Sequence, residues 1–393
     1  MRSGTYVTFG AIRCFDPGRL PPYPPIQLDG ALATALSRAD RALARLDGAT
    51  LTLPDPDLFV YAFMRQEAVL SSQIEGTQAS LDDLLEFESG SSLAGRDVGE
   101  IVNYLDAMRW GLEEIARRPV SLGLVRDMHA RLLKDGRGSE RAPGDLRRNQ
   151  NWIGPPGCTI AEASFVPPAV PLMERALGEL ESFIHAEAPL PPLIRFGLVH
   201  AQFETIHPFW DGNGRIGRML IPLLLCSEAI LARPVIYPSL YFKQHRQAYY
   251  ARLQATRDQA DWEGWLQFFL QAIEATSTSA LHTAIQINAL RSDLSARAPS
   301  LSRSNRAHLL LETLFRHPYA TVNQLAQRLG VTFPTANALA ADLLRHDVLV
   351  EVTGGRRDRI FAFKPYLEIL HDAVDDLTDV VGGRDQLAKG DSP

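Results

Sequence analysis

One segment of twelve residues, 207–218, gathers side chains that bind anions and transfer protons. It reads HPFWDGNGRIGR and lies between two apolar stretches with helical spacing. Gly212 and Gly214 flank Asn213 and allow several backbone N–H groups of the turn to point the same way, which forms a concave anion site. The stretch that follows predicts a helix, whose N-terminus also attracts negative charge. The segment therefore predicts a phosphate-binding site.

Four charged or titratable side chains surround this turn. Arg215 and Arg218 lie three residues apart on the predicted helix, so they can reach the same phosphate group. Asp211 stands at the mouth of the turn, and a carboxylate beside a phosphate site is the usual protein ligand of Mg²⁺. His207 is suited to accept a proton from an attacking hydroxyl near neutral pH. Together these residues favour attack of a hydroxyl on a bound phosphate compound.

The rest of the chain predicts mainly helices that would position this segment. Apolar residues recur at helical spacing over the ranges 32–46, 57–74, 101–116, 121–133, 172–185, 193–206, 215–231 and 244–289. Ser80 and Asp83 fit a capping box that begins one more helix. The first 30 residues are rich in proline and predict an extended arm. Residues 145–168 place Pro and Gly between β-prone segments and predict a loop or irregular hairpin.

Length and composition exclude several classes of protein. The chain has 393 residues, of which 46% are hydrophobic, so it predicts two or three folded domains and not a disordered chain. A net charge of −6 argues against a surface that binds nucleic acid along the whole chain. No run approaches the roughly 20 apolar residues that span a bilayer, so we expect no membrane contact. Three well-separated cysteines and the lack of a secretion signal predict a cytoplasmic location.

The segment at 207–218 resembles the signature of the Fic family, HPFx[DE]GNGRxxR, and matches it at every fixed position. The proline-rich start, the block LFVYAFMRQEAVLSSQIEGTQASL and the stretch around NWIG also resemble Fic proteins, so the resemblance covers about residues 10–370. It implies a mainly α fold: a Fic-type helical bundle with a β-hairpin flap, here followed by a winged-helix domain. It also implies a protein adenylyltransferase, which transfers AMP from ATP to a Tyr, Ser or Thr hydroxyl of a target protein.

The resemblance assigns a role to each residue of the signature. His207 would deprotonate the target hydroxyl, and Asp211 would bind Mg²⁺ between the α- and β-phosphates. The turn would form the anion hole for the α-phosphate, and both arginines would contact the phosphates; these nucleotide-binding residues are Gly212, Asn213, Gly214, Arg215 and Arg218. Family members that phosphorylate their targets tend to carry Lys in place of Gly214, so this sequence favours AMP transfer.

Residues 71–76 read SSQIEG and match the family's inhibitory pattern [ST]xxxE[GN]. Ser71 and Glu75 are four residues apart, so they share one face of a helix. The resemblance implies that Glu75 pairs with Arg218 and withdraws it from the γ-phosphate. In some relatives the inhibitory Glu also helps to remove AMP from a modified target. A transferase inhibited by Glu75 and an enzyme that both adds and removes AMP therefore remain alternatives.

The C-terminal part, 305–370, predicts three helices followed by two strands, which is the order of a winged helix. Residues 301–364 contain nine basic and five acidic residues. The expected wing carries positive charge that suits the DNA backbone, at Arg356, Arg357 and Arg359. The last of the three helices would be the recognition helix, and it offers polar side chains for base edges at Thr332, Thr335 and Asn337. That helix carries little positive charge, so contact with protein, including a second copy of the chain, is an equal alternative. A DNA-binding regulator that only senses nucleotide is the competing function.

These expectations divide the chain into five parts: 1–110, the N-terminal arm and helices with the inhibitory pattern; 111–290, the Fic catalytic core; 291–304, a polar linker; 305–370, the winged helix; and 371–393, a tail. The flap at about 152–166 would dock the target segment by strand addition, which places few demands on target sequence. Tyr249 resembles the family residue near the adenine, and either it or Tyr250 would stack on the base.

Overall fold

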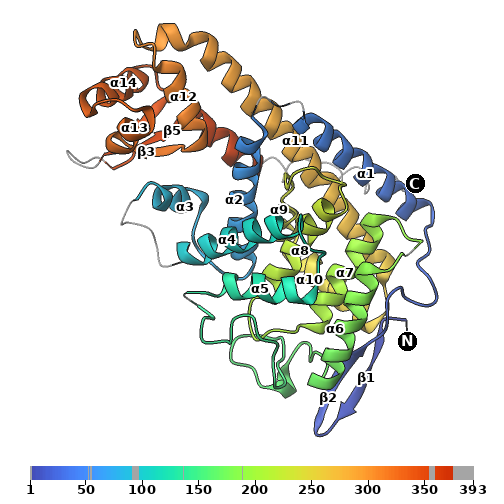
Figure 1. The fold of residues 1–393 in the computed structure, drawn as a ribbon. Helices are drawn as coiled ribbons and strands as arrows, with labels where there is room; N and C mark the ends of the chain where they lie inside the picture. Colours follow the sequence, from blue (N-terminus) through green and yellow to red (C-terminus); the bar gives the residue numbers. More distant parts are fainter. Residues whose placement is uncertain are drawn as a thin grey trace, which may run out of the picture.

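Helices make up most of the structure, which is a computed structural model of the chain (Figure 1). It describes residues 2–51, 53, 55–90, 97–135, 137–187, 189–353 and 359–374. The helices up to the end of the long α11 are α1 (Gly30–Leu51), α2 (Pro56–Ile74), α3 (Leu81–Glu88), α4 (Val98–Glu114), α5 (Leu122–Leu132), α6 (Val170–His185), α7 (Pro192–Ile206), α8 (Asn213–Ser227), α9 (Ser239–Gln244), α10 (Arg246–Asp258) and α11 (Trp262–Leu301), with a short 3₁₀ helix at Ile160–Glu162. None of the described helices is both long and apolar enough to cross a membrane.

The N-terminal arm is not simply extended. Strands β1 (Gly4–Phe9) and β2 (Ile12–Pro17) form an antiparallel hairpin, in which Gly4 lies opposite Pro17. The arm is extended as expected, but its pairing into a hairpin was not predicted; the prolines cluster from residue 17 onward, where the chain is irregular up to α1. The N–H of Phe15 donates to the carbonyl of Val166, 3.0 Å away, so the hairpin lies against the end of the flap.

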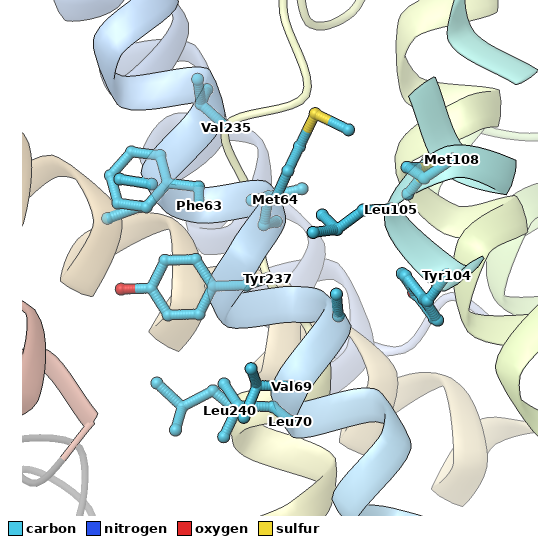
Figure 2. Close-up of a cluster of buried hydrophobic side chains, with 14 of the residues drawn as sticks. Phe63, Met64, Val69, Leu70, Tyr104, Leu105, Met108, Val235, Tyr237 and Leu240 are labelled. Carbon is cyan, nitrogen blue, oxygen red and sulfur yellow. The ribbon is translucent and has the colours of Figure 1, made fainter. Parts of the chain in front are cut away.

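Helix α2 lies in the middle of the hydrophobic core. Figure 2 shows its side chains Phe63, Met64, Val69 and Leu70 between two neighbours, α4 and the segment that enters α9. Phe63 stacks on Tyr237 with ring centroids 5.3 Å apart. The helix begins at Pro56, followed by Asp57, two residue types that suit a first helical turn. The next helix, α3, begins with the predicted capping box of Ser80 and Asp83, which is confirmed.

The region predicted as a loop or irregular hairpin contains a minimal one. Ile153 and Phe165 form an isolated antiparallel bridge, with N···O distances of 2.9 and 3.1 Å. The residues between them are largely irregular, apart from the 3₁₀ turn. The flap is thus a wide loop closed at its base.

The C-terminal unit comprises residues 305–353 and 359–374. Its named elements are α12 (Ala307–Arg316), β3 (Tyr319–Thr321), α13 (Val322–Leu329), α14 (Phe333–Arg345), β4 (Leu349–Glu351) and β5 (Ile360–Phe363). The strands form an antiparallel sheet in the order β3-β5-β4. The three helices and the last two strands follow in the predicted order, but the strand β3 between α12 and α13 was not predicted, and the winged-helix assignment stays a prediction. Arg356 and Arg357 lie outside the described residues, as does the tail beyond residue 374.

The polar linker expected at 291–304 is mostly helix. Helix α11 continues without interruption to Leu301, and Leu294, Ala298 and Leu301 are buried along it. Arg291 on this helix also pairs with Glu312 of α12 at 2.7 Å. The serine-rich composition suggested a linker, but these sparse apolar positions bury one face of α11, which joins the two parts of the chain directly.

Candidate active site

The phosphate-binding turn lies between α7 and α8 and is closed by its own asparagine. The N–H of Phe209 donates to Oδ1 of Asn213, and Nδ2 of Asn213 donates to the carbonyl of Phe209, both at 2.9 Å. Gly212 precedes α8 with φ 76°, a left-handed conformation that glycine adopts without steric cost. The turn is therefore fixed by local sequence, and the free N–H groups at the start of α8 open toward the site.

His207 ends α7 in a strained backbone conformation. Its φ of 49° and ψ of 61° lie in the left-handed region, which costs on the order of 1 kcal/mol for a residue with a Cβ. Burial, together with the charges of Arg257 and Arg147, lowers the pKa of His207 to about 3. Nδ1 is buried and accepts or donates no hydrogen bond within the described residues. At neutral pH the imidazole is therefore uncharged and keeps a lone pair for a proton, and the lowered pKa makes it a weaker base than a free imidazole.

Arg147 holds the backbone around His207, a role that sequence patterns did not reveal. It is 1% exposed, and its guanidinium donates to the carbonyls of His207 at 3.0 Å, Pro168 at 2.5 Å and Asn149 at 3.3 Å. Burial lowers the pKa of Arg147 to about 10. Nδ2 of Asn151 adds a bond to the carbonyl of Phe209 at 3.0 Å. These contacts attach the base of the flap to the turn.

His129 of α5 supports the other side of the turn and was also missed. Its Nδ1 accepts from the N–H of Gly144 at 2.9 Å, so the ring proton is on Nε2, which donates to the carbonyl of Asp211 at 3.0 Å. The ring stacks on Phe209 at 3.8 Å and 7°. Burial lowers the pKa of His129 to about 4, which keeps it neutral. Both missed residues act on backbone atoms, which leave no pattern in a sequence.

Arg215 lies inside the protein at 1% exposure, not on a solvated face. Its Nη1 is 3.3 Å from Oε2 of Glu100, and its Nη2 is 3.4 Å from Oδ1 of Asp211. Arg137 also contacts Glu100, at 3.2 Å. Nε of Arg215 is buried and has no partner in the described part of the chain. Arg215 thus connects α4 to the mouth of the turn, and its Nε remains able to donate a hydrogen bond.

Arg218 is held by the end of α2. Its Nε donates to Oγ of Ser71 at 2.9 Å, and its Nη2 donates to the carbonyl of Ser71 at 2.9 Å and to Oε1 of Glu75 at 2.7 Å. Burial opposes ionisation of Glu75, but the charge and hydrogen bond of Arg218 outweigh it and lower the pKa of Glu75. The carboxylate lies against Gly214, where a Cβ would come within 2.3 Å of Oε1. Glu75 therefore stands over the N-terminal turn of α8.

Tyr249, which is expected near the adenine, is buried in the structure. It is 1% exposed, its hydroxyl is 2.9 Å from Nε2 of His200, and its ring stacks on Phe242 at 4.7 Å. Its helix turns this residue toward the core, and the assignment of Tyr249 to the nucleotide stays a prediction. Its neighbour Tyr250 is 44% exposed.

Asp211 is the remaining residue of the predicted set. Its side chain is 38% exposed, and its Oδ1 accepts from the N–H of Gly212 at 2.6 Å. No cluster of three or more His, Cys, Asp or Glu suited to a metal ion occurs among the described residues. The structure thus brings together His207, the turn, both arginines, Asp211, Ser71 and Glu75, while Tyr249 is buried beside them.

Comparison with known protein families matches residues 33–113 to the Fic/DOC family N-terminal region and residues 119–225 to the Fic/DOC family itself. Residues 33–113 and 119–225 of this chain are thus similar to Fic/DOC family proteins. The second match contains the entire turn, and the first contains Ser71 and Glu75.

Several curated proteins similar to this chain carry the name protein adenylyltransferase. Protein adenylyltransferase fic-1 of Caenorhabditis briggsae is 27% identical over 189 residues, 46% of this chain and 34% of the relative. Protein adenylyltransferase Fic of Drosophila virilis is 28% identical over 201 residues, 50% of this chain and 36% of the relative. The chain thus spans about a third of the length of these relatives.

A solved structure of a Fic family protein from Desulfovibrio desulfuricans G20 has the same fold. It superposes with a TM-score of 0.57 at 18% sequence identity and covers 86% of this chain and 98% of its own. The mainly helical Fic fold predicted from the sequence is confirmed by this neighbour.

Proposed function

We propose that this Fic protein is an adenylyltransferase that transfers AMP from ATP to a hydroxyl of a target protein. The observation that carries the proposal is the turn between α7 and α8, with a neutral histidine at one end and the N-terminus of α8, which has no side-chain cap, at the other. The names of the relatives support the same activity. Phosphorus transfer of this kind depends mainly on positioning and on neutralising charge, which such a turn supplies.

In this proposal the ATP phosphates bind at the start of α8. The N–H groups of the turn residues Gly212, Asn213 and Gly214 contact the α-phosphate, and Arg215 and Arg218 neutralise the phosphate charge. The buried, unsatisfied Nε of Arg215 supports an anionic ligand beside it. His207 accepts the proton of the target hydroxyl, which its uncharged form allows.

Asp211 fits the single-carboxylate contact that Mg²⁺ makes when it accompanies ATP. Its Oδ2 accepts no hydrogen bond from any described residue, and its side chain is partly exposed at the mouth of the turn. Mg²⁺ bound there would neutralise charge on the phosphates. The lack of a three-ligand protein cluster is consistent with this role, since water and phosphate oxygens supply the other ligands.

The second part of the proposal is autoinhibition by Glu75. The ion pair with Arg218 at 2.7 Å occupies a guanidinium that the nucleotide needs, and the carboxylate stands beside Gly214 in the expected phosphate space. A negative charge at this position repels phosphate as well as withdrawing Arg218. Removal of AMP is the alternative activity, favoured by the same carboxylate, which lies close enough to His207 to act on its pKa.

The flap is proposed to dock the target by strand addition, because the bridge between Ile153 and Phe165 is the one backbone pairing of strand type that the structure describes between its two sides. Homodimerisation and DNA binding remain proposals for the C-terminal unit. DNA binding is the weaker of the two, since Arg359 already donates to Oδ1 of Asn337 at 2.8 Å and contacts Glu351 at 3.4 Å.

The test uses the purified chain with Mg²⁺ and ATP labelled on the α-phosphate. We expect labelled protein with Glu75→Gly and none with Glu75→Gly/His207→Ala, although the double variant still binds ATP. Label on the double variant would remove His207 from its role as the base. ATP binding with no label on any variant, in the presence or absence of candidate targets, would favour nucleotide sensing or AMP removal.

A further inference from the structure

Glu75, the inhibitory residue of our proposal, is connected by a short segment to α3, and α3 contacts the C-terminal unit. Glu75 caps the end of α2, and only residues 76–80 separate it from α3. Gln73, in the last turn of α2, bonds to this segment: its Nε2 donates to the carbonyl of Ala79 at 2.9 Å. The position of α3 therefore restrains the last turn of α2.

Both ends of α3 are bonded to the C-terminal unit. At the first turn, Oδ1 of Asp82 accepts from the hydroxyl of Tyr319 at 3.0 Å, and its Oδ2 lies 3.3 Å from Nε2 of His371. At the last turn, the carbonyl of Ser89 accepts from Nε2 of Gln324 at 2.9 Å. Figure 1 shows α3 directly beneath the sheet and helices of this unit.

The unit also contacts α2 itself. Nε2 of Gln66 donates to the carbonyl of Leu370 at 2.9 Å in a buried position, and Arg316 pairs with Asp55, the residue before α2, at 2.6 Å. Gln66 lies nine residues before Glu75, which is about 14 Å along a helix. The C-terminal unit thus touches the inhibitory region before, along and after α2.

This junction is not tightly filled. A cavity of about 380 Å³ lies between α2, α3 and the C-terminal unit, lined by apolar side chains such as Leu70, Leu81 and Leu370 and by polar ones such as Gln73 and His371. The junction buries apolar side chains such as Leu85 and Leu367, but the cavity beside them leaves it fewer packing contacts to lose than a solid core. The contact between the unit and α3 is therefore easier to open than the core around Phe63.

We propose that the C-terminal unit controls the Glu75–Arg218 ion pair through α3. While the unit holds Asp82 and Ser89, the last turn of α2 keeps Glu75 on Arg218. When the unit withdraws from α3, the segment 76–80 loosens and the last turn of α2 frays. A displacement of about 1 Å is enough to break a hydrogen bond of 2.7 Å. A partner that binds the C-terminal unit and pulls it from α3 would therefore activate the enzyme; this consequence for activity rests on the proposed function.

The test removes the contacts of the unit with α3 while preserving its own fold. Tyr319→Phe removes one hydroxyl. Gln324→Glu removes the donor to Ser89 but keeps the acceptor that caps α13, where Oε1 of Gln324 accepts from the N–H of Thr321 at 3.0 Å. The control is Lys364→Gln, which breaks an exposed ion pair with Asp347 inside the same unit. The single variants serve if the double variant unfolds.

Two measurements are made on the full chain. We expect amide hydrogen exchange over residues 71–80 to be about five- to thirtyfold faster in Tyr319→Phe/Gln324→Glu than in wild type or the control, the range that 1–2 kcal/mol of lost coupling gives. We expect self-labelling with AMP to rise by a similar factor.

Unchanged exchange over 71–80 in the folded double variant overturns the proposal. So does faster exchange without more labelling, provided that Glu75→Gly is labelled in the same assay. If Glu75→Gly itself takes no label, the proposed function fails instead, and the exchange measurement alone still decides whether the unit restrains Glu75.

Discussion

Oε1 of Glu75 lies 2.7 Å from Nη2 of Arg218, although 143 residues separate the two along the chain. The pair joins the end of α2 to the first turns of α8. Ser71, one turn before Glu75, contacts the same guanidinium twice. In this conformation Nε and Nη2 of Arg218 donate to Ser71 and to Glu75, at the end of α2.

The charge of Glu75, not only its size, should set the strength of inhibition. We expect Glu75→Gln to show self-labelling between wild type and Glu75→Gly, because a neutral amide keeps a hydrogen bond but loses the stronger charge-assisted one. A loss of about 1.4 kcal/mol corresponds to about tenfold more labelling than wild type. Glu179→Gln is the matched control, since Glu179 of α6 pairs with Arg19 of the N-terminal arm and touches neither α2 nor α3 in that pair. Equal labelling of Glu75→Gln and wild type would contradict this account.

Gly214 should be required for nucleotide binding as well as for the ion pair. A Cβ at this position would lie 2.3 Å from Oε1 of Glu75 and 2.9 Å from Nη1 of Arg218. In the Glu75→Gly background, we expect Gly214→Ala to raise the Kd for ATP about tenfold, as measured by calorimetry. Gly178→Ala is the control, because a Cβ there meets no atom within 4 Å. An unchanged Kd would mean that the phosphates do not approach Gly214.

Arg147 should stabilise the fold more than any ordinary surface arginine. Arg147→Met leaves three backbone carbonyls without their donor in a buried region, so we expect a loss of about 3 kcal/mol in the free energy of unfolding. Its neighbour Arg148, with a side chain 86% exposed, supplies the control. Arg148→Met should change stability by no more than about 0.5 kcal/mol in urea unfolding. Similar midpoints for the two variants would refute the role of Arg147.

The neutral state of His129 should make the protein sensitive to acid. Its pKa is lowered in the folded state to about 4, whereas the unfolded value is 6.5. The unfolded chain thus binds the proton first, and the stability present above pH 6.5 is lost as the pH falls toward 4. Between pH 7 and pH 4.5 this residue alone accounts for about 2 kcal/mol.

His129→Asn keeps an acceptor for the N–H of Gly144 but does not titrate. We therefore expect the variant to lose about 2 kcal/mol less than wild type between pH 7 and pH 4.5, measured by denaturant unfolding at each pH. Identical losses in both proteins would show that protonation of His129 does not contribute. His200 is buried and has a pKa lowered to about 4, so it acts in the same direction in both proteins and cancels in the comparison.

The turn and its flanking helices were predictable because the information is local. The expected helices at 193–206 and 215–231 became α7 (Pro192–Ile206) and α8 (Asn213–Ser227), with the glycines between them as expected. Glu75 and Arg218 are distant in sequence, and only the resemblance to Fic proteins suggested that they meet.

Residues that act through backbone atoms were not predictable. Arg147 and His129 bind carbonyls and N–H groups of segments that approach only in the folded chain. The burial of Tyr249 depends on which face of α10 packs against α7 and α11, which its own sequence does not define. The sequence did not predict that α11 continues to Leu301, because the buried residues within 291–301 are few and lie among serines and arginines.

Helix α11 has 40 residues and therefore measures about 60 Å, and it belongs to both parts of the molecule. Its first half packs on α1 and α7, and its far end carries the C-terminal unit. Because residues 291–301 continue α11 and do not form a flexible linker, the C-terminal unit is attached to the rest of the molecule by a stiff helix. Any tilt of the C-terminal unit must therefore bend α11. Pro299 lies inside the helix and lacks an N–H, so bending is easiest there. The angle of the C-terminal unit is thus set by the mechanical stiffness of a single helix close to its end.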